Sequence, residues 1–143
     1  MNVKKMSIDD VELEEARGKA QAGQAHILIL ENNSARFFMA DEVFGYLSWT
    51  AILGADSERI DLRYGSDLPN GFHTFDAVGL RLWYRAPDGE LYTSALEGKV
   101  FINVIRPQFG TEFEHDGVLL NVRYAKSDGS FVVLNGTFNN SST

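Results

Sequence analysis

Most of this chain alternates apolar and polar residues in short segments, and that period of two is the feature that most constrains its fold. Each segment is bounded by Gly, Pro, Asn or Asp, as strands separated by turns are. No stretch between them carries the roughly 10–15 residues of helical periodicity that a parallel crossover needs, so we expect antiparallel links. The predicted strands are Ala25–Leu30, Arg36–Ala40, Tyr46–Leu53, Arg59–Tyr64, Ala77–Arg85, Glu90–Leu96, Lys99–Arg106, Gly117–Ala125 and Ser130–Phe138.

The pattern therefore predicts an all-β fold, an antiparallel β-sandwich of about 8–9 short strands, with a small β-barrel as the alternative. Asp41–Gly45 and Asp67–Phe75 are predicted to be loops, because their polar and turn-forming residues interrupt the alternation.

Two hairpins share a turn type that fixes their register. A three-residue loop, Ser127–Gly129, with Gly129 in the left-handed conformation, places Lys126 opposite Ser130. Counting from that pair gives an apolar face on both strands, made of the pairs Tyr124–Val132, Val122–Leu134, Leu120–Gly136 and Val118–Phe138. The same turn chemistry in Pro87–Gly89 places Ala86 opposite Glu90 and predicts the pairs Tyr84–Tyr92, Leu82–Ser94 and Leu80–Leu96.

Residues 1–24 differ in composition from the rest of the chain, with Asp and Glu concentrated between Ser7 and Arg17. Ser7 is the predicted N-cap of a short helix, on which Ile8, Val11 and Ala16 form a partial apolar face and Leu13 lies off it. We interpret 1–24 as an acidic segment, a short helix or disordered, and 25–143 as a single β-sandwich domain. A frayed terminus and a partner-binding acidic helix are both open for the first segment.

Composition excludes several chemistries. The 20 acidic against 13 basic residues give a net charge of −7, which disfavours binding to a nucleic-acid backbone. The absence of cysteine removes disulfides, thiolate metal sites and cysteine nucleophiles. The glycines are dispersed one per turn, and the known metal-binding spacings do not occur, so we predict no cofactor and no metal.

The first residues favour a protein without a signal peptide or a membrane segment. Lys4 and Lys5 are followed by Ser7–Asp10, where a signal peptide would have its apolar region. The longest apolar run is far shorter than the roughly 20 residues of a spanning helix, so no membrane insertion is expected. The default compartment is the cytoplasm, or the exterior if a leader has been removed.

Trp83 is the most suggestive candidate for a binding residue. It lies between Arg81 and Arg85, on the strand face opposite Leu80 and Leu82. A flat aromatic ring beside polar groups is a common platform for sugars, so the candidate ligand-binding residues are Trp83, Arg81, Arg85 and Thr93. Trp49 shares its parity with Leu47, Ala51 and Leu53, which predicts burial, whereas Phe109 and Phe113 are predicted to be an exposed pair.

Three functional hypotheses follow. The first is a non-enzymatic binding or interaction domain that recognises a protein or a carbohydrate. The second is a small hydrolase or isomerase, which requires Glu112, Glu114, His115 and Asp116 to converge with Asp67 or His73 in one pocket. The third is an acidic inhibitor that mimics nucleic acid, which requires acidic residues aligned on one face.

Overall fold

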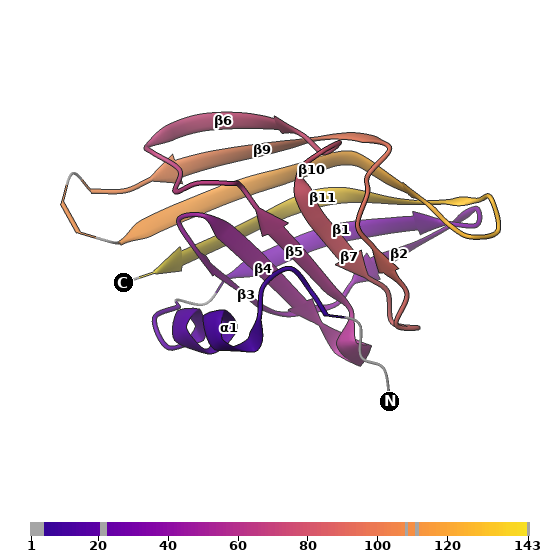
Figure 1. Cartoon of the computed structure of the whole chain (residues 1–143), viewed down its shortest axis with the longest axis horizontal. Coiled ribbons are helices and arrows are strands. Elements are labelled where there is room, and N and C mark those ends of the chain that lie inside the picture. The colour runs from indigo at the N-terminus through magenta and orange to yellow at the C-terminus, as the bar shows by residue number, and fades with distance from the viewer. Residues whose placement is uncertain (1–4, 21–22, 108, 111, 143) are drawn as a thin grey trace.

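The computed structural model describes residues 5–20, 23–107, 109–110 and 112–142, and they form two antiparallel sheets packed face to face (Figure 1). Sheet A has six strands in the order β2-β1-β11-β10-β9-β6, and sheet B has five in the order β3-β4-β5-β7-β8. The strands are β1 (Gln24–Glu31), β2 (Ser34–Phe38), β3 (Ala40–Tyr46), β4 (Trp49–Gly54), β5 (Arg59–Arg63), β6 (Gly71–Asp76), β7 (Arg81–Arg85), β8 (Leu91–Tyr92), β9 (Glu97–Ile105), β10 (Phe113–Ala125) and β11 (Phe131–Ser142). The β-sandwich prediction is confirmed, and the sheets do not close into the alternative barrel.

The main core lies between the two sheets, where alternate residues of each strand point inward. Ile27, Ile102 and Leu134 contribute from sheet A, and Ile60 and Leu82 contribute from sheet B, all at most 1% exposed. Among the described residues, no helix has the length and apolar character needed to span a membrane.

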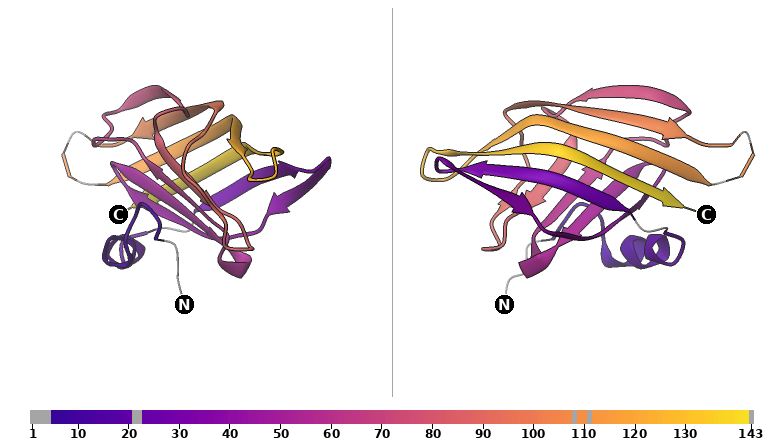
Figure 2. Two further views of the ribbon diagram at one scale, coloured as in Figure 1. Left: turned by 45° about the vertical axis from the view of Figure 1, so that its right-hand side comes forward. Right: turned by 180° about the vertical axis from the view of Figure 1, so that it is seen from behind.

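A second, smaller core lies on the outer face of sheet B, under the helix α1 (Asp10–Arg17). We call residues 7–17 the N-terminal strap. Its buried members and the sheet residues beneath them are Ile8, Leu13, Ala16, Phe44, Trp49 and Ala51. Figure 2 shows α1 lying against sheet B, away from sheet A. The predicted burial of Trp49 is confirmed, at 5% exposed.

The expected helix exists, but its cap and its buried face differ from the prediction. Asp9, not Ser7, is the N-cap, and its side chain accepts a hydrogen bond of 2.9 Å from the Glu12 amide. Leu13 is 5% exposed, whereas Val11 is 68% exposed. Because the helix begins at Asp10, Ile8 lies before it and does not mark its apolar face; the buried face is instead set by Leu13 and Ala16, which are three residues apart.

Two segments predicted to be loops are strands. Asp41–Gly45 belongs to β3 and residues 71–75 belong to β6, and each of these strands lies at the edge of a sheet. Edge strands expose more of their residues to solvent, so their polar composition resembled that of a loop. Two other predictions were too long, because β7 begins at Arg81 after a turn in which Gly79 has φ +84°, and β8 ends at Tyr92.

The register of the β10–β11 hairpin is confirmed near its turn and wrong beyond it. The Lys126 amide donates to the Ser130 carbonyl at 2.8 Å, and Val122 pairs with Leu134 as predicted. A β-bulge between Leu119 and Val122 then shifts the pairing by one residue. Gly117 instead of Val118 therefore faces Phe138, so Val118 and Leu120 lie on the outer face at 38% and 44% exposed.

Candidate functional site

The four residues predicted to bind a ligand lie at or near β7 in sheet B, but they do not form one compact group. Arg81 is exposed, with its guanidinium 5.8 Å from the centre of the half-buried Trp83 ring. Arg85 donates from Nε to the Ser57 carbonyl at 2.9 Å. The β7–β8 pairing ends at Tyr84–Tyr92, so the exposed Thr93 is not a strand partner of Trp83.

The strand next to β7 holds the N-terminal strap through a buried ion pair. Asp61, 0% exposed, accepts hydrogen bonds from the Ile8 amide at 3.0 Å and from the Ser7 hydroxyl at 3.3 Å. It also accepts two bonds from the Arg59 guanidinium, at 2.6 and 2.9 Å. Arg59 in turn donates to the Ile8 carbonyl at 2.8 Å. These bonds satisfy both buried charges, which is what burial of an ion pair requires.

The outer face of sheet A carries a different arrangement, with a hollow of about 360 Å³. We call it the sheet A hollow. Its aromatic members are Phe72, on the edge strand β6, and Phe101, on β9. Their ring centres are 6.3 Å apart, and Phe72 is 70% exposed. A large aromatic side chain held open to solvent on a rigid strand is a candidate contact surface.

Polar side chains surround those rings because five strands place them in two adjacent rows. Strand pairing aligns one row from Gln24 through Asn139, Asp116 and Asn103 to Phe72. The next row runs from His26 through Thr137, Val118 and Phe101 to Thr74. Residues two positions apart on a strand share a face, so both rows lie on the outer face of sheet A, and all of their members except Thr74 line the hollow.

A third group of polar side chains is buried between the sheets. The Thr50 hydroxyl lies 2.6 Å from the Tyr64 hydroxyl and donates to Asn140 Oδ1 at 3.3 Å. His115, 0% exposed, pairs with Asn140 across β10 and β11, and its ring contacts Phe113 and Tyr64. Burial, together with the electrostatic effect of the nearby His73 and Arg106 side chains, lowers the pKa of His115 to about 4, so the ring is neutral at pH 7.

The residues that an enzyme would use are dispersed. His115 points into the core, whereas Glu114 and Asp116, its neighbours on β10, lie exposed on the opposite face. The His73 Nε2 atom lies 2.8 Å from the Pro69 carbonyl, outside the sheet A hollow. Within the described ranges, no three His, Asp or Glu side chains are grouped as metal ligands.

The prediction of an exposed Phe pair is half right. Phe109 is 83% exposed, but Phe113 is 2% exposed and packs against His115 and Tyr46. The sequence reasoning missed Phe72, because it lay in a segment predicted to be a loop. The alternation of Phe72 and Thr74 with His73 and Phe75 was the signal that could have found it.

Comparison with known proteins adds no family. No family model matches the chain, and no curated protein or solved structure is significantly similar to it.

Proposed function

We propose that this chain is a non-enzymatic binding domain that recognises a carbohydrate in the sheet A hollow. The observation that carries the proposal is that the rings of Phe72 and Phe101 lie beside a row of amide and carboxylate side chains on the outer face of sheet A. The volume of about 360 Å³ lies within the range of small-ligand sites.

The chemistry of the hollow suits a sugar ring, which has apolar C–H faces and a rim of hydroxyl groups. The Phe rings offer flat apolar area, and aromatic contacts add about 0.5–1.5 kcal/mol beyond their buried area. Asn103 and Asn139 both donate and accept hydrogen bonds, and Asp116 accepts them, so together they match hydroxyl groups. Because Asn103 and Asp116 are strand partners, their positions relative to one another are fixed by the sheet.

The other two hypotheses have less support. An enzyme would need acid–base groups directed at one point, whereas His115 and the two acids beside it point to opposite sides of β10. An acidic inhibitor would need an open acidic face, whereas in the described part of the chain Glu12, Glu31, Asp61 and Asp76 are among eight acids that form ion pairs.

A glycan array probed with the full chain tests the proposal. We expect binding to a defined set of glycans, and we expect Phe72→Ala to lower the affinity roughly tenfold, as the loss of about 1.4 kcal/mol would. Asn103→Ala should also weaken binding, because a sugar hydroxyl loses its partner.

Phe109→Ala is the matched control. Phe109 is 83% exposed and lies outside the sheet A hollow, so its removal should leave glycan affinity unchanged. An array with no bound glycan, or equal loss of affinity in Phe72→Ala and Phe109→Ala, would contradict the proposal.

A further inference from the structure

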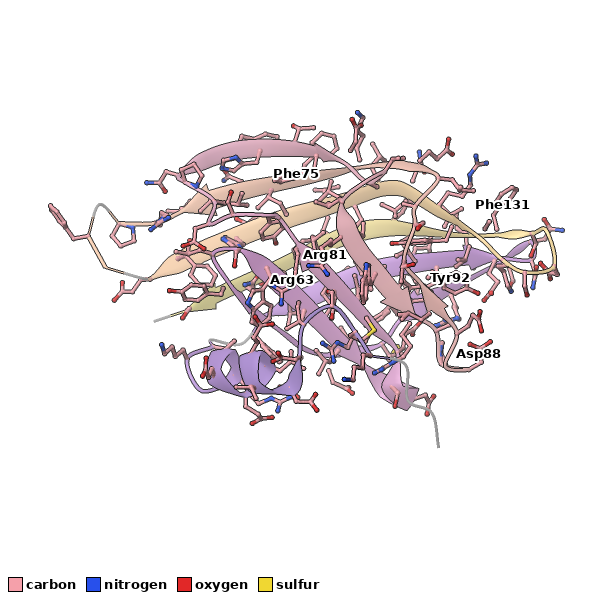
Figure 3. All side chains as sticks on the ribbon, in the orientation of Figure 1. Arg63, Phe75, Arg81, Asp88, Tyr92 and Phe131 are labelled. Carbon is pink, nitrogen blue, oxygen red and sulfur yellow. The ribbon has the colours of Figure 1, made fainter. Side chains whose placement is uncertain are left out.

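Strands β5 and β7 present the same two-arginine spacing on the outer face of sheet B. β5 has Arg59 and Arg63, and β7 has Arg81 and Arg85. Antiparallel pairing sets Arg59 beside Arg85 and Arg63 beside Arg81. Figure 3 shows Arg63 and Arg81 close together on this face. Between the arginines, β5 has Asp61 where β7 has Trp83.

The structure already shows what the β5 arginines bind. Arg59 donates to the Ile8 carbonyl at 2.8 Å, and Arg63 donates from Nε to the Ser7 carbonyl at 3.1 Å. Arg63 also forms an ion pair with Glu12. The β5 pair therefore binds two backbone carbonyls at the start of the strap and one of its acidic side chains.

We propose that Arg81, Trp83 and Arg85 form a docking site for an acidic segment of a partner protein, which lies beside the chain's own strap. Arg81 and Arg85 are four residues apart on β7, the same separation as that of Arg59 and Arg63 on β5, which contact the consecutive carbonyls of Ile8 and Ser7. Trp83 offers a half-buried ring for an apolar side chain of the partner. This site lies on the outer face of sheet B and the hollow lies on the outer face of sheet A, so the inference stands independently of carbohydrate binding.

Charge identifies the occupant as acidic. Four of the chain's eight arginines lie in β5 and β7 on this face, although the whole chain has a net charge of −7. Asp61 compensates Arg59, and Glu12 compensates Arg63. Arg81 is exposed and contacts the ring of Trp83. Burial and the nearby charge of Arg59 lower the pKa of Arg85, an effect that Asp61 partly offsets, so an anion beside Arg85 would stabilise its charged guanidinium.

The test uses a synthetic peptide with the sequence of residues 7–17, because this face already binds that sequence within the chain. The peptide carries a fluorophore and is titrated with the full-length protein at about 50 mM salt, where electrostatic attraction is weakly screened. We expect saturable binding, and we expect the double variant Arg81→Gln/Arg85→Gln to lower the affinity at least tenfold. A peptide with Asn and Gln in place of Asp and Glu should also bind at least tenfold more weakly.

Arg123→Gln is the matched control. The Arg123 guanidinium lies 4.5 Å from the centre of the Phe131 ring on the outer face of sheet A, so it repeats the arginine–aromatic contact at another place. This variant should bind the peptide as the wild type does. Loss of binding in Arg123→Gln equal to that in the β7 variant would overturn the proposal, because it would indicate attraction to charge alone.

The indole NMR signals of Trp83 and Trp49 distinguish a peptide that docks beside the strap from a peptide that displaces the strap. In a ¹H–¹⁵N spectrum of the full-length protein, assigned with Trp83→Phe, the peptide should shift the Trp83 indole and leave the Trp49 indole in place. Trp49 is 5% exposed under α1, so its movement would mean that the peptide had displaced the strap. That result overturns the proposal, as does an absence of binding at about 50 mM salt.

Discussion

Asp61→Asn is the substitution from which we expect the largest loss of stability. Asp61 is 0% exposed, and its carboxylate accepts bonds from Arg59, from the Ile8 amide and from the Ser7 hydroxyl. Asparagine has the same shape and keeps one acceptor oxygen, but it removes the charge. The Arg59 guanidinium, on a side chain 9% exposed, is then left buried without a counter-charge.

The expected cost follows from that burial. Breaking a buried ion pair by neutralising one partner costs about 3–5 kcal/mol, a large part of the roughly 5–15 kcal/mol that stabilises a typical domain. For a chain of this size, such a loss corresponds to a fall in Tm of roughly 10–15 °C. The amide hydrogens of the strap should also exchange faster with solvent, because two of the bonds that hold Ser7 and Ile8 end on this carboxylate.

Urea denaturation and amide hydrogen exchange measure the two effects in parallel. Asp76→Asn is the control, since Asp76 forms an ion pair with Lys99 in which both side chains are at least half exposed, and its loss should cost less than about 1 kcal/mol. A free energy of unfolding for Asp61→Asn within 1 kcal/mol of the wild type would refute the reasoning. So would unchanged exchange at residues 8–17.

Three further predictions concern the core between the sheets. Between pH 6.5 and 4 the unfolded chain binds a proton at His115 that the folded chain does not, so wild-type stability should fall by about 2–3 kcal/mol more than that of His115→Leu, as urea denaturation at pH 7 and 4.5 would measure. An equal fall in the two proteins would contradict this. Gly117→Ala should lower stability by about 1–3 kcal/mol in thermal unfolding, because the added Cβ would lie 2.2 Å from the buried Phe138 ring, and an unchanged Tm would refute that contact. Tyr84→Phe should cost about 2 kcal/mol in urea denaturation, because its hydroxyl donates to the buried carboxylate of Glu58 at 2.5 Å, and a neutral effect would show that this bond contributes nothing.

The sequence predicts the interior strands and the hairpin turns well because local physics determines them. One face of an interior strand must be apolar, and a Gly in the third loop position fixes the register near the turn. Tyr124 and Val132 pair as predicted for that reason. The bulge near Asn121, where φ is +50°, depends on a neighbouring strand, because a Cβ on Gly98 would lie 2.7 Å from Val122 Cα. Counting along one strand could not reveal it.

The candidate sites are less predictable because both depend on contacts between distant segments. The sequence identifies Arg81, Trp83 and Arg85 as neighbours on one face, but it does not show that the N-terminal strap lies on the adjacent strand. The sheet A hollow combines residues from five strands, and its alignment of Gln24 with Phe72 needs every strand partner between them. No local pattern carries that information.

Nuclear Overhauser effects from the protein to a bound sugar test the central claim most directly. With the glycan that binds most strongly on the array, we predict contacts from the sugar ring protons to the ring protons of Phe72 and Phe101. Contacts confined to Trp83, or no contact from either Phe ring, would contradict carbohydrate recognition in the sheet A hollow.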